Sequence, residues 1–183
     1  NMGRVYDNLG EKGKALDYYE EALPLRRQVG DPSGEATTLN NIGLVYSALG
    51  EKGKALDYYE EALPLSRQVG DRSGEAMTLN NMATIFYQQG DYTRAAEKFS
   101  GVVKIAQGIG AVSKEALFSR NLAFLLHHHL DETARAIELL QRSVALLRQY
   151  QLPQDAGGAT LAQHEASLAE LLCSRGEPED EDE

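Results

Sequence analysis

The sequence predicts an all-α protein, a right-handed superhelical solenoid of antiparallel helix hairpins. Three observations predict it. The string at 11–31 returns at 51–71 with one change, Arg26 to Ser66, which gives a period of 40 residues. Apolar residues recur at helical spacing within each copy. No segment alternates apolar and polar residues with the period of two that a strand would need.

About four copies fit the chain, and the first lacks its opening turns. The expected repeats are residues 1–30, 31–70, 71–110 and 111–150, followed by a linker and capping helix at 151–175. Small residues occupy matching positions in the copies: Gly3, Gly43, Ala83 and Ala123, and also Ala15, Ala55, Ala95 and Ala136. In the last copy the turn is one residue longer. Small residues let helix backbones approach, so these positions mark the expected contacts between hairpins.

The first helix of each hairpin is typified by residues 36–49. Its apolar residues recur at i, i+3, i+6, i+7 and i+10, which places them on one side of a helix: Leu39, Ile42, Val45, Tyr46 and Leu49. Gly50 follows at the place where a left-handed backbone ends a helix. At the other end of this helix, Asp31 is the expected N-cap and Pro32 the expected first helical residue.

The second helix of the hairpin is expected at about 53–69, ending at Gly70. Its apolar side is formed by Ala55, Leu56, Tyr59, Ala62, Leu63 and Leu65. Pro64 lies within it, as Pro24 does in the preceding copy. Because the apolar spacing continues past each proline, we expect a bend rather than a break.

A further helix is expected at about 159–174, after the interruption at 151–158. Its apolar side would be Leu161, Ala166, Leu168, Leu171 and Leu172, and its polar positions Gln163, His164 and Glu170. Such a helix would cover the open end of the solenoid. Residues 176–183 carry six carboxylates, so we expect a disordered acidic tail.

The repeated positions resemble the tetratricopeptide repeat. The pattern is carried by Leu39, Ile42, Gly43, Tyr46, Gly50, Ala55, Tyr59 and Ala62. The 40-residue period resembles the long-period subclass of kinesin light chains, Pins-type adaptors and bacterial sensor proteins. The resemblance implies that the first helices line a concave groove and that the partners are proteins or peptides.

Four asparagines recur at the repeat period, two residues before each small residue of the first helix: Asn1, Asn41, Asn81 and Asn121. We name them the asparagine ladder. A side-chain amide both donates and accepts hydrogen bonds, so the ladder could hold the backbone of an extended peptide. The alternative is that these amides bond to neighbouring helices within the stack.

The predicted groove also includes residues one turn away from the ladder: Arg4, Asn40, Leu44, Asn80, Thr84, Tyr87, Arg120, Phe124 and His127. Tyr87 and Phe124 suggest an apolar anchor for the peptide. The groove has no lysine and arginine cluster of the kind that clamps a terminal carboxylate. Arg4 and Arg120 are its cations, and each would pair with an acidic ligand residue or face solvent.

Composition excludes several classes of function. The net charge is -10, which disfavours nucleic acid and anionic lipid as partners. One cysteine, Cys173, excludes a disulfide framework and fits a reducing, cytoplasmic location. No apolar run is long enough to span a membrane. Residues 10–14 fail the phosphate-loop spacing, and three consecutive histidines at 127–129 cannot face one metal on a helix. We therefore expect no cofactor and no enzyme.

The main hypothesis is a protein–protein interaction scaffold that binds an extended peptide through the asparagine ladder. One alternative is self-assembly through the apolar face of the first hairpin, formed by Met2, Val5 and Tyr6. Another is that the array is the sensing arm of a larger bacterial signalling protein.

Overall fold

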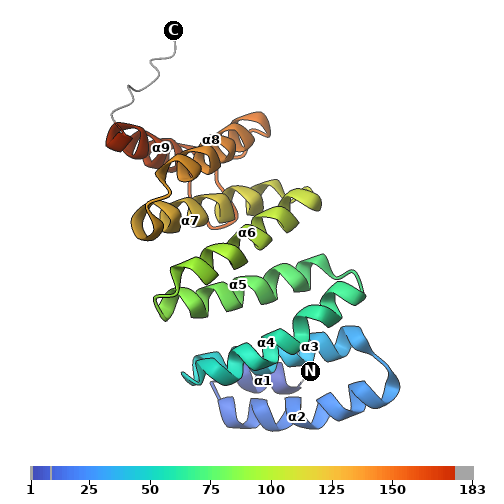
Figure 1. Ribbon diagram of the computed structural model, residues 1–183. Helices are drawn as coiled ribbons and strands as arrows, with labels where there is room; N and C mark the ends of the chain where they lie inside the picture. Colours follow the sequence, from blue (N-terminus) through green and yellow to red (C-terminus); the bar gives the residue numbers. More distant parts are fainter. Residues whose placement is uncertain (1, 9, 176–183) are drawn as a thin grey trace. The chain divides into compact units, whose positions relative to one another are not determined.

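The computed structural model describes residues 2–8 and 10–175, and it is all-α (Figure 1). Asn1 and the predicted acidic tail lie outside the described residues. The helices are α1 Met2–Asn8, α2 Lys12–Val29, α3 Pro32–Ala48, α4 Lys52–Gln68, α5 Arg72–Gln88, α6 Tyr92–Gly108, α7 Val112–Leu130, α8 Thr133–Gln149 and α9 Leu161–Arg175. Among the described residues, Gln154 and Thr160 form an isolated antiparallel β-bridge. The predicted all-α repeat fold is confirmed.

The chain forms two compact units. Unit 1 spans residues 1–90 and contains α1 to α5, and unit 2 spans residues 91–183 and contains α6 to α9. In unit 1, α1 packs on α2 and α3 on α4, with α5 against α4. In unit 2, α7 packs on both α6 and α8, and α9 packs on α8. Each helix thus covers the apolar face of its neighbours, which is how a repeat array forms a core.

The helix ends follow the predicted local chemistry. The carboxylate of Asp31 accepts a hydrogen bond from the backbone N–H of Gly34 at 2.8 Å, and Pro32 is the first residue of α3. Gly50 has a φ of 81°, the left-handed conformation predicted after α3. The helices α2 and α4 run without a break through Pro24 and Pro64.

Close contact between α3 and α4 depends on a glycine. A Cβ atom at Gly43 would lie 2.7 Å from the ring of Tyr59 and 3.1 Å from the carbonyl oxygen of Ala55. Both Tyr59 and Ala55 are fully buried. The same relation joins Gly3 to Tyr19 one repeat earlier, at the same 2.7 Å. The predicted role of small residues at hairpin contacts is confirmed at these positions.

The last hairpin differs from the others, but the predicted longer turn was wrong: two residues join α7 to α8, whereas three join α3 to α4, and the extra length lies in the helix. Helix α7 has 19 residues where α3 and α5 have 17. Asp131 takes the left-handed conformation there, with a φ of 55°. After this turn, Ala136 and Leu140 are buried in α8.

The terminal helix forms close to the predicted range, but the predicted apolar face was partly wrong. His164 is fully buried and Ala166 is exposed, the reverse of the prediction, whereas Leu171 is buried as expected. The physical reason is a hydrogen-bond network that satisfies the imidazole inside the protein. That network also orders residues 151–158, which the sequence suggested were only a linker.

Candidate functional site

In unit 1 the polar contact between α3 and α5 centres on Asn40. Its side-chain oxygen accepts hydrogen bonds from the Thr78 hydroxyl at 3.2 Å and from the Asn81 amide at 3.5 Å. Asn40 is only 4% exposed. The sequence placed Asn40 in the groove, but its amide oxygen is used inside the stack. We therefore leave Asn40 out of the proposed contact surface.

The ladder residue Asn41, next to Asn40 in the sequence, has a different environment. Its side chain is half-buried and forms no hydrogen bond with any described residue. Leu44, one turn later in α3, is 43% exposed. An unpaired amide beside an exposed apolar side chain is suited to contact a ligand rather than the core.

On α5, the predicted residues divide between packing and surface. Thr84 and Tyr87 are exposed, and Asn80 and Asn81 are half-buried. Burial raises the pKa of Tyr59 to about 12, and the nearby Asn81 side chain works against that rise. Asn81 donates to Asn40, and the buried Tyr59 hydroxyl has no hydrogen-bond partner among the described residues. Arg4, on α1, is exposed.

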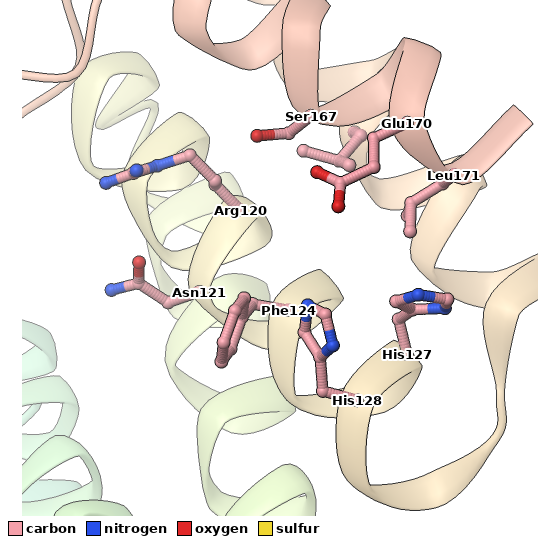
Figure 2. Close-up of a pocket in the computed structure, with 9 residues that line it drawn as sticks. Arg120, Asn121, Phe124, His127, His128, Ser167, Glu170 and Leu171 are labelled. Atoms are coloured by element: carbon pink, nitrogen blue, oxygen red, sulfur yellow. The ribbon is translucent and has the colours of Figure 1, made fainter. Parts of the chain in front are cut away.

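Unit 2 contains a pocket with a cavity volume of about 560 Å³, shown in Figure 2. Its lining residues come from α7, α8 and α9, and they are Arg120, Asn121, Phe124, His127, His128, Leu140, Ser167, Glu170 and Leu171. Four of these were predicted groove residues: Arg120, Asn121, Phe124 and His127. The sequence did not predict the wall that α9 supplies.

The three consecutive histidines point to different partners, as predicted from helical geometry. His127 Nδ1 lies 2.9 Å from the Thr133 hydroxyl. The His128 ring is tilted against Phe124 with a centroid distance of 4.1 Å, and His129 stacks on Tyr92 at 3.9 Å. In the described part of the chain, no group of three or more histidine, cysteine, aspartate or glutamate residues could hold a metal ion.

A buried network attaches α9 to the rest of unit 2. His164 Nε2 lies 3.0 Å from an Asp155 carboxylate oxygen, and His164 Nδ1 lies 2.6 Å from the Ser143 hydroxyl. The Arg120 guanidinium lies 3.4 Å from the same Asp155 oxygen. Burial lowers the pKa of His164, against the opposing effect of the Asp155 carboxylate. The neutral imidazole then donates to Asp155 and accepts from Ser143.

Serine, histidine and aspartate are also the residues of a hydrolase triad, but the two imidazole nitrogens are exchanged here, with Nδ1 facing Ser143 and Nε2 facing Asp155. Ser143 and His164 are, however, fully buried, and Asp155 nearly so. A nucleophile must reach its substrate, so this network holds α9 in place and offers no attacking hydroxyl. Two features could have indicated it: a serine on the apolar face of α8, and a histidine six positions after the second of two consecutive glycines.

The described residues thus define an all-α protein of stacked helix hairpins with solvent-facing amides on its first helices. A family model for the tetratricopeptide repeat matches residues 1–68 and 34–108, more than half of the chain. The chain belongs to the tetratricopeptide repeat family, whose fold is generally a protein–protein interaction module.

Solved structures share this fold. BtubC from P. vanneervenii is 24% identical with a TM-score of 0.74, covering 96% of this chain and 70% of that one. A putative kinesin light chain from Podosopora anserina is 15% identical with a TM-score of 0.72, covering 96% and 84%. A signal transduction ATPase with a tetratricopeptide repeat sensor, from Pyrococcus horikoshii, is 20% identical with a TM-score of 0.73, covering 91% and 25%. At these identities the likeness concerns the fold.

No curated protein matches this sequence. None of the described helices has the length and apolar character that crossing a membrane requires.

Proposed function

We propose that the chain is a scaffold that binds an extended segment of a partner protein through side-chain amides on its first helices. The observation that carries this proposal is that Asn41 and Asn121 have no hydrogen-bond partner among the described residues. They occupy the same repeat position in units 1 and 2. An amide of this kind can donate to a peptide carbonyl and accept from a peptide N–H, whatever the peptide's side chains are.

Exposed apolar side chains on the first helices support the proposal. Leu44 is 43% exposed on α3, Met77 is 51% exposed on α5, and Phe124 is 54% exposed on α7. Backbone contacts supply affinity that does not depend on sequence, and apolar contacts nearby select particular side chains. Each unit therefore has both kinds of contact on its own first helices.

The proposal predicts opposite results for two neighbouring asparagines. A peptide selected from a random display library against the full chain would be titrated by calorimetry. Replacing both Asn41 and Asn121 with alanine should weaken binding about tenfold, because a hydrogen bond contributes about 0.5–1.5 kcal/mol. The melting temperature should stay near that of the wild type.

Asn40→Ala is the matched control, since Asn40 is buried and bonds to Thr78. This variant should lower thermal stability and leave the affinity per folded molecule unchanged. Unchanged affinity in the Asn41 and Asn121 double variant, combined with a loss of stability, would show that the ladder is structural.

A second candidate function is self-association through α1. Met2 is 51% exposed there and Tyr6 is half-buried, so part of the predicted apolar face is open. A mass that rises with concentration in light scattering, and that Met2→Lys returns to the monomer value, would support this candidate.

A further inference from the structure

The pocket in unit 2 combines an apolar floor with an aromatic wall. Leu140 and Leu171 are buried beneath it, and Phe124 stands at its side with more than half of its surface exposed. The His128 ring lies 4.1 Å from the Phe124 ring and extends the aromatic surface. A floor and wall of this kind can receive the aliphatic stem of a long side chain.

The charge that enters this pocket is negative. Figure 2 shows the Glu170 carboxylate reaching from α9 toward Phe124 and His128. Glu170 forms no ion pair or hydrogen bond with any described residue. An apolar occupant would remove water from this carboxylate without replacing its hydrogen bonds, which is costly.

Arg120 does not neutralise that carboxylate. Its guanidinium lies 3.4 Å from Asp155 and is directed away from Glu170 in Figure 2. An acidic occupant would therefore meet Glu170 before it met a free cation. A cation would instead satisfy the carboxylate and lie against the face of Phe124, a contact that aromatic rings favour.

We propose that this pocket binds one lysine or arginine side chain of the partner peptide. The stem lies on Leu140 and Leu171, and the charged group lies between Glu170 and Phe124. Asn121, which also lines the pocket, pairs with the peptide backbone beside the bound residue. This proposal rests on the proposed function, and it adds the chemistry of one partner residue. The net charge of -10 also favours the approach of a cationic segment.

The test uses capped nonapeptides of serine, glycine and alanine that differ only at the central residue. The central residue is lysine, arginine, norleucine or glutamate, and binding to the full chain is followed by NMR. Lysine and arginine peptides should shift the signals of Phe124, His128 and Glu170. The norleucine peptide should bind several-fold more weakly, and the glutamate peptide more weakly still.

Two variants and a control sharpen the result. Glu170→Gln should weaken the lysine peptide about fivefold and leave the norleucine peptide unchanged. Phe124→Leu, which keeps an apolar side chain but removes the ring, should also reduce the preference for lysine. Glu138→Gln removes the same charge from an exposed site outside the pocket and should change neither peptide.

Several outcomes would overturn the inference. Equal binding of the lysine and norleucine peptides would show an apolar pocket, and preference for glutamate would mean that Arg120 sets its charge. If every peptide shifts the side-chain amides of Asn41 and Asn121 equally, the scaffold function stands and the cation site is wrong. If no peptide shifts any of these signals, both proposals fail.

Discussion

At the residue scale, the fold depends on positions where a single carbon atom would not fit. Gly43 is the clearest, because its place is filled by the ring of Tyr59 and the backbone of Ala55. Gly53, in the adjoining helix α4, has no atom within 4 Å of the Cβ position. Of these two glycines, ten residues apart, Gly43 leaves no room for a side chain, whereas Gly53 has open space around its Cβ position.

Gly43→Ala should destabilise the protein by about 1–3 kcal/mol, because the added methyl group must displace Tyr59 or separate the two helices. The free energy of unfolding from urea titrations is the measurement.

Gly53→Ala is the matched control, and it should stabilise the protein by about 0.5–1 kcal/mol, because alanine favours the helix and the site is open. If both substitutions stabilise, α3 and α4 are further apart than the contacts of Gly43 indicate.

At the scale of the element, α9 is held by a polar network as well as by leucines. His164 faces Asp155 from the preceding loop and Ser143 from α8, while Arg120 approaches from α7. Burial lowers the pKa of His164 from its ordinary value near 6.5. Below that pH the unfolded or detached segment therefore binds a proton more readily than the docked helix does.

The docking of α9 should accordingly weaken as the pH falls below about 6.5, and it should be independent of this group at higher pH. The docking equilibrium can be measured by hydrogen exchange of the α9 backbone amides between pH 5 and pH 8, after correction for the intrinsic exchange rate.

His164→Gln removes the titration but keeps an amide that can contact Asp155. The pH dependence in that window should diminish, whatever the overall loss of stability. A variant that kept the full pH dependence would assign it to another group.

The sequence was sufficient to predict the hairpins but not this network, for a physical reason. Hairpin contacts repeat every 40 residues, so Gly43 or Ala55 can be aligned with equivalents elsewhere in the chain. The contacts of His164 occur once, outside the periodic region. Helical periodicity assigns a histidine to the polar face unless its partners are known. The partner of His164 is Asp155, and only the folded conformation of the loop brings the two side chains together.

The residues of the candidate site that lie on the repeats were predicted, whereas those that depend on non-repeated packing were not. Asn121 and Phe124 lie on the surface of α7 as the repeat register indicates. Asn40 and Asn41 are neighbours of the same type, and their environments differ because helical rotation turns one toward Thr78. The sequence placed Glu170 on the polar side of the terminal helix, but its position in the pocket depends on how α9 packs.

At the scale of the whole molecule, the chain comprises two compact units with local contacts. In a repeat protein, stability is approximately a sum of intrinsic and nearest-neighbour terms. A substitution should therefore change the local stability mainly of the helices that contact the substituted residue.

Hydrogen exchange by mass spectrometry can check this locality. Gly43→Ala should increase exchange in α3 and α4, and α8 and α9 should keep their wild-type protection. In the reverse experiment, Ser143→Ala should affect α8 and α9 but not α3. Equal increases throughout the chain would show that it unfolds as one cooperative body.

The position of α9 has a thermodynamic consequence. The same helix carries His164 into the interior and presents Ser167, Glu170 and Leu171 to the pocket. A ligand in the pocket and the proton on His164 therefore act on one docking equilibrium with opposite signs. Linkage requires that each reduces the affinity of the protein for the other. A partner captured at neutral pH would bind more weakly in mild acid, even though His164 does not line the pocket.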